Sequence, residues 1–396
     1  MRASAAAAVL MAAGSARAGG PGSDDRVSLL RDAAGRAWSE EAPRRFRING
    51  LLQTRWNGNI RQTGSDPSVD DFDAGFELRR VRLSVTGDLT PVSSDVRLRY
   101  FVQAQFSRST GVPTIFDAVV SAERGRWRAR AGQFIVPLTR EALVSNQRRL
   151  AVEDSLTNIA FGFSNPAFRS QGVEGRYRDD AWDVRLMVND GSGTLGGGFA
   201  GEETDIGLTA RVQRAWFADG ETDWDRFRDF TSKRGQPLAV LVGAAGHVSF
   251  GETDADGDGV QLESFVEGRW TADVSVEGDG WNGFVAAYGF HRIEQGANGI
   301  DRYGLAAHAG VYATETLEPF VQYSLAGGGD GEGTLSVLVA GANKYFAGHA
   351  LKLTGDVGYV FEPVTDAFDN EPRTVLIDAA GEDGQVFARV QLQVVF

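Results

Sequence analysis

Arginines at every second position are the most regular charged pattern in this sequence. They occur in three short stretches, and in each the residue between the two arginines is apolar. Side chains alternate between the two faces of a β-strand, so the two arginines of each stretch point to the same side. Guanidinium groups along one wall of a pore attract anions and pass them on. The candidate wall consists of Arg80, Arg82, Arg97, Arg99, Arg128 and Arg130.

A second group of charged residues follows after Arg130, in a segment without alternation at about 135–169. An unpatterned segment of this length inside a compact domain is usually functional. We expect it to fold into the space that the strands enclose and to act as a constriction loop. Its charges are mixed, and their balance would set the selectivity of a pore. They are Arg140, Glu141, Arg148, Arg149, Glu153, Asp154 and Arg169.

Signals for catalysis or metal binding are weak. The chain has no cysteine, which excludes disulfides, thiolate nucleophiles and cysteine-based zinc sites. Its four histidines are scattered without metal-ligand spacing. The acidic residues Asp254, Asp256 and Asp258 copy the first half of an EF-hand calcium loop, but Phe265 stands where that loop requires a bidentate glutamate. With no catalytic triad phrase and no phosphate-cradling glycine loop, we predict no enzyme activity, no cofactor and no metal site.

The elements that must position the arginines are strands. Many alternating segments are ten to fourteen residues long, which suits tilted strands that cross a bilayer, whereas strands of soluble sandwiches average about five to six residues. Their connections alternate in size between brief turns and longer loops, the arrangement of porin rims. The longer loops are 58–74, 190–203, 218–236, 251–258 and 363–382. About sixteen segments alternate, at 46–57, 75–88, 94–107, 114–124, 126–135, 170–178, 181–189, 204–217, 237–250, 259–275, 280–293, 301–314, 317–326, 333–346, 349–362 and 383–396.

Energetics decide which face of these strands meets lipid. An arginine on the lipid face costs roughly 2–4 kcal/mol at mid-bilayer, so the six arginines of the candidate wall should point into the lumen. The sequence therefore predicts an all-β fold, an antiparallel transmembrane β-barrel of about sixteen strands with an inward-folded constriction loop. A secreted soluble β protein is the alternative, because sandwich strands also alternate apolar and polar residues.

The ends of the chain indicate export to an outer membrane. Residues 1–18 read as a signal peptide, with a basic start, an apolar run and a small-x-small cleavage site. Residues 19–45 read as a mature N-terminal leader, and 46–396 as a single barrel domain. The final Phe396 follows an alternating apolar face, which resembles the C-terminal signal of inserted outer-membrane barrels. We therefore predict that the protein is located in the outer membrane of a Gram-negative bacterium.

Charge is divided unevenly along the chain. The net charge is −13, yet residues 46–190 hold 20 basic against 17 acidic side chains, while residues 191–396 hold 13 against 31. Much of the acidic excess lies in loops expected outside the cell, where divalent cations and neighbouring lipopolysaccharide are available to it. The acidity of the C-terminal half therefore does not decide what permeates.

Five stretches also resemble a known family, the phosphate-selective porins O and P. They are FELRRVRLSVTG (76–87), RLRYFVQAQF (97–106), IFDAVVSAE (115–123) followed by RARAGQFIVPLTRE (128–141), and NPAFRSQGVEGRY (165–177). The resemblance implies a sixteen-stranded outer-membrane barrel, usually a homotrimer, with its third loop folded inward and with passive diffusion of anions. Its partners would be outer-membrane lipid, lipopolysaccharide and the solutes in transit, with no nucleic acid.

The choice of solute stays open at this point. Phosphate-specialised members use lysines near the eyelet, whereas this chain has only Lys233, Lys344 and Lys352, none of them in the matching stretches. The guanidinium group of arginine binds phosphate in a bidentate manner and more firmly than the lysine ammonium group does. Conduction, however, requires that each bound anion is released again. Three interpretations remain: an anion-preferring pore, a weakly selective general diffusion porin in which loop acids oppose the arginines, and purely structural arginine ladders. A barrel with an adhesive or enzymatic role is the less favoured alternative.

Overall fold

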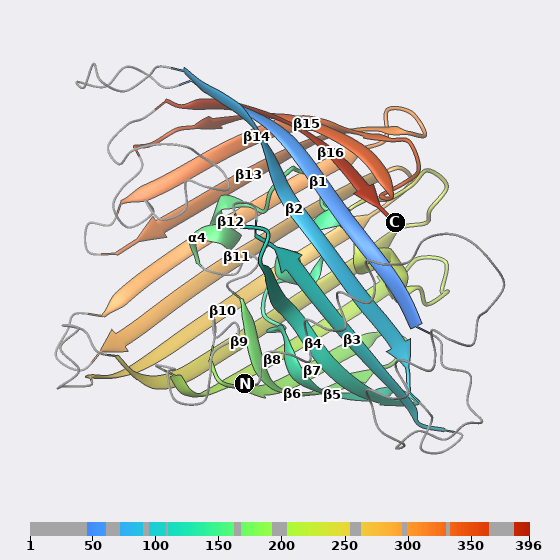
Figure 1. Ribbon diagram of the computed structural model, residues 1–396, viewed down its shortest axis with the longest axis vertical. Coiled ribbons are helices and arrows are strands. Elements are labelled where there is room, and N and C mark those ends of the chain that lie inside the picture. The colour runs from blue at the N-terminus through green and yellow to red at the C-terminus, as the bar shows by residue number, and fades with distance from the viewer. Residues whose placement is uncertain are drawn as a thin grey trace. The chain divides into compact units, whose positions relative to one another are not determined.

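The computed structural model describes residues 46–60, 72–89, 95–107, 110–161, 168–191, 204–253, 263–294, 299–329, 333–363 and 384–396. All sixteen predicted segments form strands, and these strands form one closed antiparallel barrel (Figure 1). Each strand pairs with its neighbours in the chain, and β1 closes the barrel against β16. The predicted fold class is confirmed. The strands are β1 (Phe46–Ile60), β2 (Phe72–Asp88), β3 (Arg97–Phe106), β4 (Pro113–Arg124), β5 (Trp127–Ile135), β6 (Arg169–Arg178), β7 (Trp182–Asn189), β8 (Thr204–Phe217), β9 (Ala239–Thr253), β10 (Glu263–Glu277), β11 (Trp281–Glu294), β12 (Ile300–Val311), β13 (Leu317–Gly328), β14 (Thr334–Tyr345), β15 (Leu351–Val360) and β16 (Val386–Val395).

Alternating burial shows which face of each strand meets lipid. In β16, Val390 and Leu392 are exposed on the outside, whereas Arg389 and Gln391 are buried on the inside. The same phase holds in β2, where Phe76 is 85% exposed. An exposed apolar band outside and polar groups inside is the pattern of an outer-membrane barrel.

The rims separate two kinds of connection. The backbones of Gly50 and Phe396 bond to each other through both N–H groups, at 2.6 and 3.1 Å, so the first strand begins and the last strand ends at one rim, here called the C-terminal rim. Brief turns at 125–126, 179–181 and 278–280 lie at this rim, because each follows an even-numbered strand.

The rim predicted for one loop is wrong. Its length groups the segment 218–236 with the longer loops, which are expected at the opposite rim. It follows the eighth strand, so the antiparallel order places the whole connection from 218 to 238 at the C-terminal rim. Its length misled the prediction, whereas the parity of the strand before it decides its position.

Several predicted features lie outside the described residues. They are the signal peptide at 1–18, the leader at 19–45, the acidic residues Asp254, Asp256 and Asp258, and most of the loops 58–74, 190–203 and 363–382.

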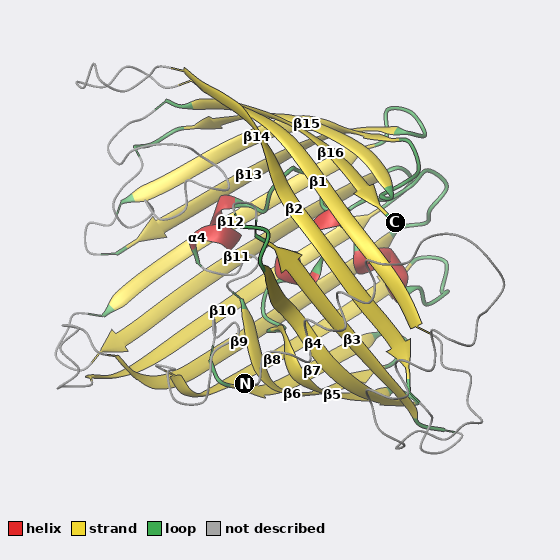
Figure 2. Cartoon of the chain, viewed as in Figure 1, coloured by secondary structure: helices red, strands yellow, loops and turns green. Residues whose placement is uncertain are grey.

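The connection from 136 to 168, here called the constriction loop, turns into the barrel after Ile135. It contains α3 (Arg140–Leu143), η1 (Asn146–Arg148) and α4 (Leu156–Ala160), which lie within the ring of strands (Figure 2). The side chains of Thr139 and Ser155 cap α3 and α4 by accepting hydrogen bonds from Ala142 N and Asn158 N. No helix among the described residues reaches the length and apolarity that a membrane span needs.

A hydrophobic core lies inside the barrel, between the constriction loop and one part of the wall. The loop contributes Leu138, Leu150, Leu156 and Ile159, all nearly completely buried. Each such side chain contributes about 1.5–3 kcal/mol when fully buried, so these residues fasten the described part of the loop from Leu138 to Ile159. Facing it are mainly inward side chains of β11 to β15, among them Phe284, Ala306, Phe320, Val337 and Val360. Phe134 of β5, Met187 of β7 and Ala245 of β9 belong to the same cluster.

Candidate functional site

The tip of the constriction loop is held by a cluster of charges on β1 and β2. The carboxylate of Glu153 accepts hydrogen bonds from Arg55 and Arg80, both at 2.7 Å, and also from Arg79. Burial by itself raises the pKa of the Glu153 carboxyl, but the charges of Arg79, Arg80 and Arg55 outweigh burial and hold that pKa well below its ordinary value. Glu153 is therefore an ionised anchor.

Hydrogen bonds to the wall fasten the rest of the loop. Lys352 and Asn343 donate to the carbonyls of Arg149 and Leu150 at 2.8 and 3.0 Å. Further along, the Thr157 hydroxyl donates to two carbonyls of β12 and β13 at 2.8 and 2.9 Å, and Arg211 on β8 donates to the Leu138 carbonyl at 2.6 Å. The loop is thus attached to β8 and to the wall from β12 to β15.

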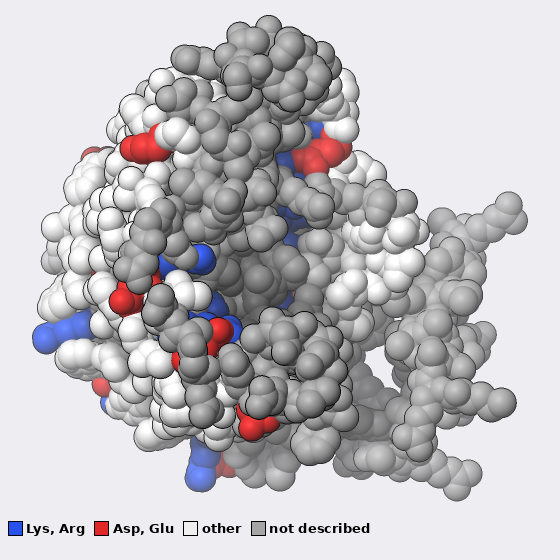
Figure 3. Space-filling model, turned by 90° about the vertical axis from the view of Figure 1, so that its left-hand side faces the viewer, with Lys and Arg blue, Asp and Glu red and all other residues white. Residues whose placement is uncertain are grey.

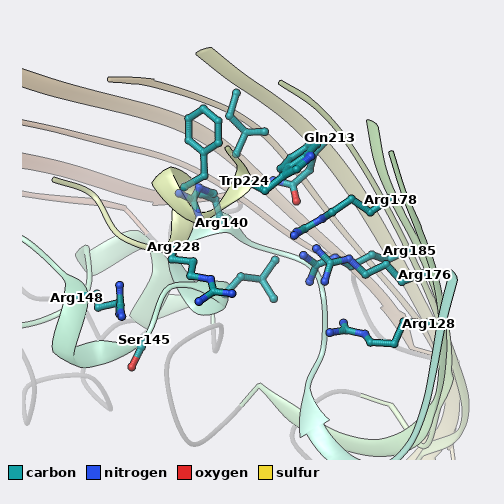
Figure 4. A pocket seen from close by; sticks show the side chains of 13 residues that line it. Arg128, Arg140, Ser145, Arg148, Arg176, Arg178, Arg185, Gln213, Trp224 and Arg228 are labelled. Carbon is teal, nitrogen blue, oxygen red and sulfur yellow. The ribbon is translucent and has the colours of Figure 1, made fainter. Parts of the chain in front are cut away.

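A cavity of about 420 Å³ remains between the loop and the wall from β5 to β9. Figure 3 shows basic side chains along the inside of the barrel's hollow. In Figure 4, Arg128, Arg176, Arg178 and Arg185 extend from the strands toward Arg140, Arg148 and Arg228. The described residues that line the cavity include seven arginines and no aspartate or glutamate. The full lining is Arg128, Arg140, Leu143, Ser145, Arg148, Arg176, Arg178, Arg185, Gln213, Trp224, Phe227, Arg228 and Leu241.

The arginines of the wall form a row across four neighbouring strands. Arg128 lies directly opposite Arg176, Arg176 opposite Arg185, and Arg185 opposite Arg211. Like charges in directly opposite positions destabilise a sheet, so the row requires acidic partners or a bound anion.

Two buried carboxylates supply part of that compensation. Glu174 accepts hydrogen bonds from Arg128 and Arg130 at 3.1 and 2.6 Å. Asp183 accepts from three arginines of β6 and β7, at 2.5, 2.7 and 3.1 Å. Both acidic side chains are 0% exposed. The three arginines bonded to Asp183 are Arg176, Arg178 and Arg185. Five arginines therefore share two carboxylates, which leaves an excess of positive charge at the cavity wall.

The six residues of the candidate wall occupy three different environments. Arg80 and Arg82 point inward but lie under the constriction loop, where Arg82 donates to Asn146 at 3.0 Å. Arg97 and Arg99 are exposed near the C-terminal rim, and Arg99 pairs with Asp88 at 3.2 Å. Of the β5 pair, Arg128 lines the cavity, whereas the Arg130 guanidinium lies 3.8 Å from the ring centre of Phe134.

The predicted loop residues also divide into two groups. Arg140 and Arg148 line the cavity. The three acids, expected as possible opponents of the arginines, are all engaged elsewhere: Glu153 as described, Asp154 in an ion pair with Arg149, and Glu141 as the acceptor for Ser155 and Tyr288. The final predicted residue, Arg169, donates to Asp117 at 3.0 and 3.2 Å.

Sequence analysis missed the three arginines of β6 and β7 that line the cavity. Arg176, Arg178 and Arg185 stand at inward positions of correctly predicted strands, so strand phase was the signal that could have found them. Arg79 carried no such signal, because it is the extra residue of a β-bulge between β1 and β2.

The connection from 218 to 238 closes the cavity toward the C-terminal rim. Its helix η2 (Trp224–Arg228) supplies three lining residues.

The Asp229 carboxylate pairs with Arg148 of the loop and with His349, both at 3.4 Å. Burial raises the pKa of Asp229, but the hydrogen bond and charge of His349 outweigh it, so that pKa is lowered. Phe230 packs against Phe284 and the buried His308, with ring centres 5.0 and 4.3 Å apart.

Comparison with known proteins supports a porin family over part of the chain and the barrel fold over most of it. Residues 61–208 match the family model described as phosphate-selective porin O and P, which confirms the predicted resemblance over that stretch. It contains β2 to β7, the constriction loop and the start of β8. A comparison with curated proteins found no match.

Solved structures of outer-membrane proteins share the fold. OmpT of Vibrio cholerae in its trimer form is 11% identical with a TM-score of 0.60, covering 90% of this chain and 100% of that chain. The anion-selective porin from Comamonas acidovorans is 12% identical with a TM-score of 0.59, covering 89% and 100%. The channel DcaP of Acinetobacter baumannii is 15% identical with a TM-score of 0.57, covering 91% and 99%. At these identities the likeness establishes the barrel fold alone.

Proposed function

We propose that this chain, an outer-membrane porin by its family match and its fold, conducts small anions in preference to cations. The observation that carries the proposal is the cavity lined by seven arginines and, among the described residues, by no carboxylate. A wall of this kind concentrates anions and repels cations. The loop acids that would have neutralised it are bound to other groups, which favours an anion preference over a weakly selective pore.

Passage through the cavity needs weak binding as well as attraction. Glu174 and Asp183 already accept hydrogen bonds from five guanidinium groups. An entering anion therefore competes with these carboxylates for donors instead of meeting free arginines. Competition of this kind shortens the residence of each anion and suits passive diffusion from one arginine to the next.

We further propose that the chain is exported through a signal peptide at 1–18 and assembles as a homotrimer among lipid and lipopolysaccharide. The trimer form of the Vibrio cholerae protein, which shares this fold, supports the assembly. The exposed apolar band of the barrel supports contact with lipid. The match to a porin family supports a channel without enzymatic activity.

The direct test is the reversal potential of the purified porin in a planar bilayer under a potassium chloride gradient. We expect its sign to be that of an anion-selective pore, and to remain so when potassium phosphate replaces the chloride salt. A cation-selective potential would overturn the proposal. A potential near zero would favour the weakly selective diffusion pore.

A further inference from the structure

The cavity is larger than passage of single inorganic ions requires. Its volume of about 420 Å³ falls in the range of roughly 300–1,000 Å³ that is typical of sites for small organic molecules. It is also enclosed from two directions, by the constriction loop and by the connection from 218 to 238. A solute of organic size would therefore contact protein on these two sides as well as on the wall from β5 to β9.

The cavity lining also includes apolar side chains, which together are here called the apolar side. Leu143 of the loop, Trp224 and Phe227 of η2, and Leu241 of β9 line the cavity beside the arginines. The combination of a convergent charged cluster and an apolar surface is typical of sites that orient an organic ligand.

The Trp224 ring is held in place before any solute arrives. Its indole N–H donates to the Asp179 carbonyl at 2.9 Å, and its ring packs edge to face against Phe217 with centres 6.4 Å apart. The Arg178 guanidinium lies 4.7 Å from the ring centre. An aromatic surface is thus fixed next to the arginine wall, and ordering it costs an incoming ligand little.

We propose that this cavity is a binding chamber for organic anions in which a flat ring carries a doubly charged headgroup. The proposal rests on the anion preference proposed above. The headgroup would lie among Arg128, Arg176 and Arg185, and the ring would contact the apolar side at Trp224. Two negative charges suit the site, since five arginines share only Glu174 and Asp183.

The connection from 218 to 238 forms the floor of the chamber, that is, its boundary toward the C-terminal rim. Arg148 of the loop binds Asp229, which directly follows η2 and the three lining residues that η2 supplies. The Arg140 guanidinium also donates to the Asp229 carbonyl at 3.2 Å and lies 5.1 Å from the ring centre of Phe230. These contacts hold the apolar side at a fixed position relative to the loop arginines.

Phenyl phosphate and inorganic phosphate form a matched pair of probes in a buffer alkaline enough for both to be dianions, because they then carry the same charge and differ by the ring. Each is added to the wild-type porin in potassium chloride, and its apparent affinity is measured from the interruption of single-channel current. We expect phenyl phosphate to bind roughly 3- to 10-fold more tightly, as one aromatic contact allows. Trp224→Leu should reduce this ratio toward one, and Trp224→Phe should retain most of it.

Trp182→Leu is the matched control, since Trp182 lies on the exposed outer face of β7, and it should leave the ratio unchanged. Equal affinities for both probes in an anion-selective wild-type pore would overturn the chamber and leave the proposed function standing. A cation-selective pore would overturn both. If Trp224→Leu does not assemble, the comparison of the two probes on the wild-type porin still decides the question. A wild-type preference for phenyl phosphate that Trp224→Leu leaves unchanged would also reject the chamber.

Discussion

Arg176 and Arg185 lie directly opposite each other on β6 and β7, and both donate to the single buried carboxylate of Asp183. Side chains of the same charge in this position repel each other. Asp183 cannot neutralise both, because Arg178 bonds to it as well. The excess positive charge at this point therefore faces the cavity, and it is the structural basis for the expected selectivity.

Replacing both Arg176 and Arg185 with glutamine should weaken the anion preference. A unit charge at about 4 Å in water contributes about 1 kcal/mol, so we expect the anion-to-cation permeability ratio to fall about fivefold for each charge. The measurement is the reversal potential under a salt gradient. Arg126→Gln is the control, because Arg126 lies in the exposed turn between β4 and β5. An unchanged potential in the double variant would remove the row from the mechanism.

Replacing Arg97 and Arg99 with glutamine should have a smaller effect than the β6 and β7 pair. Both residues are exposed near the C-terminal rim, where water and salt screen their charge. We expect a change in permeability ratio of less than about twofold at physiological ionic strength. If replacing Arg97 and Arg99 shifted the reversal potential more than replacing Arg176 and Arg185, the selectivity of the pore would be determined at the rim.

Asp183→Asn should make the pore more anion-selective and the barrel less stable. The variant removes the charge that three guanidinium groups share. Loss of charged hydrogen bonds at a buried site costs about 2 kcal/mol, so the temperature at which the folded barrel converts to its unfolded gel mobility should fall. Asp180→Asn is the control, because Asp180 is exposed in the neighbouring turn. A lower anion preference in Asp183→Asn would contradict the proposed role of the excess charge.

The anchor at Glu153 should survive mild acid. Its pKa is held well below the ordinary value, so the stabilisation that it contributes is present at neutral pH and is lost only as the pH falls through that lowered pKa. We expect the loop-dependent noise of single-channel current to be equal at pH 7 and pH 5 and to rise only in stronger acid. Glu153→Gln should show that noise already at pH 7, whereas Glu315→Gln, in an exposed turn, should not. Wild-type noise that rises between pH 7 and pH 5 would contradict this assignment.

Asp229→Asn should loosen the floor of the cavity. The variant breaks the ion pair that joins the connection from 218 to 238 to Arg148 of the constriction loop. It also leaves Arg148 with one acidic partner fewer. We therefore expect a higher conductance for anions together with more frequent current fluctuations. Glu221→Gln is the matched control, since Glu221 is exposed on the same segment and does not line the cavity. An equal response in both variants would mean that Asp229 does not link the two segments.

The strands, their phase and the position of the constriction loop could be predicted from the sequence. Alternation marks each strand, and the cost of a lipid-facing arginine decides which face turns inward. An inward position alone does not make a pore residue, however. Arg80 and Arg128 obey the same rule, yet Arg80 is covered by the loop and Arg128 lines the cavity.

The rest depends on contacts between distant segments. Nothing near Glu153 in the chain indicates that its partners are Arg55, Arg79 and Arg80. These arginines lie 98, 74 and 73 positions earlier in the sequence. The bulge at Arg79 and the core between the loop and β11 to β15 are equally invisible to strand periodicity. The charge balance of the cavity therefore had to come from the fold.

The core inside the barrel has a consequence for how such a protein can change. Because the constriction loop packs mainly against β11–β15, these strands serve as its scaffold, and the proposed filter lies in a crescent from β5 to β9 with the two segments that border it. The family match at 61–208 contains most of that crescent. Conservative substitutions in the scaffold should therefore leave the proposed selectivity unchanged, whereas substitutions in the crescent should alter it. Selectivity and assembly are thereby carried largely by different strands of one chain, except where a buried carboxylate such as Asp183 serves both.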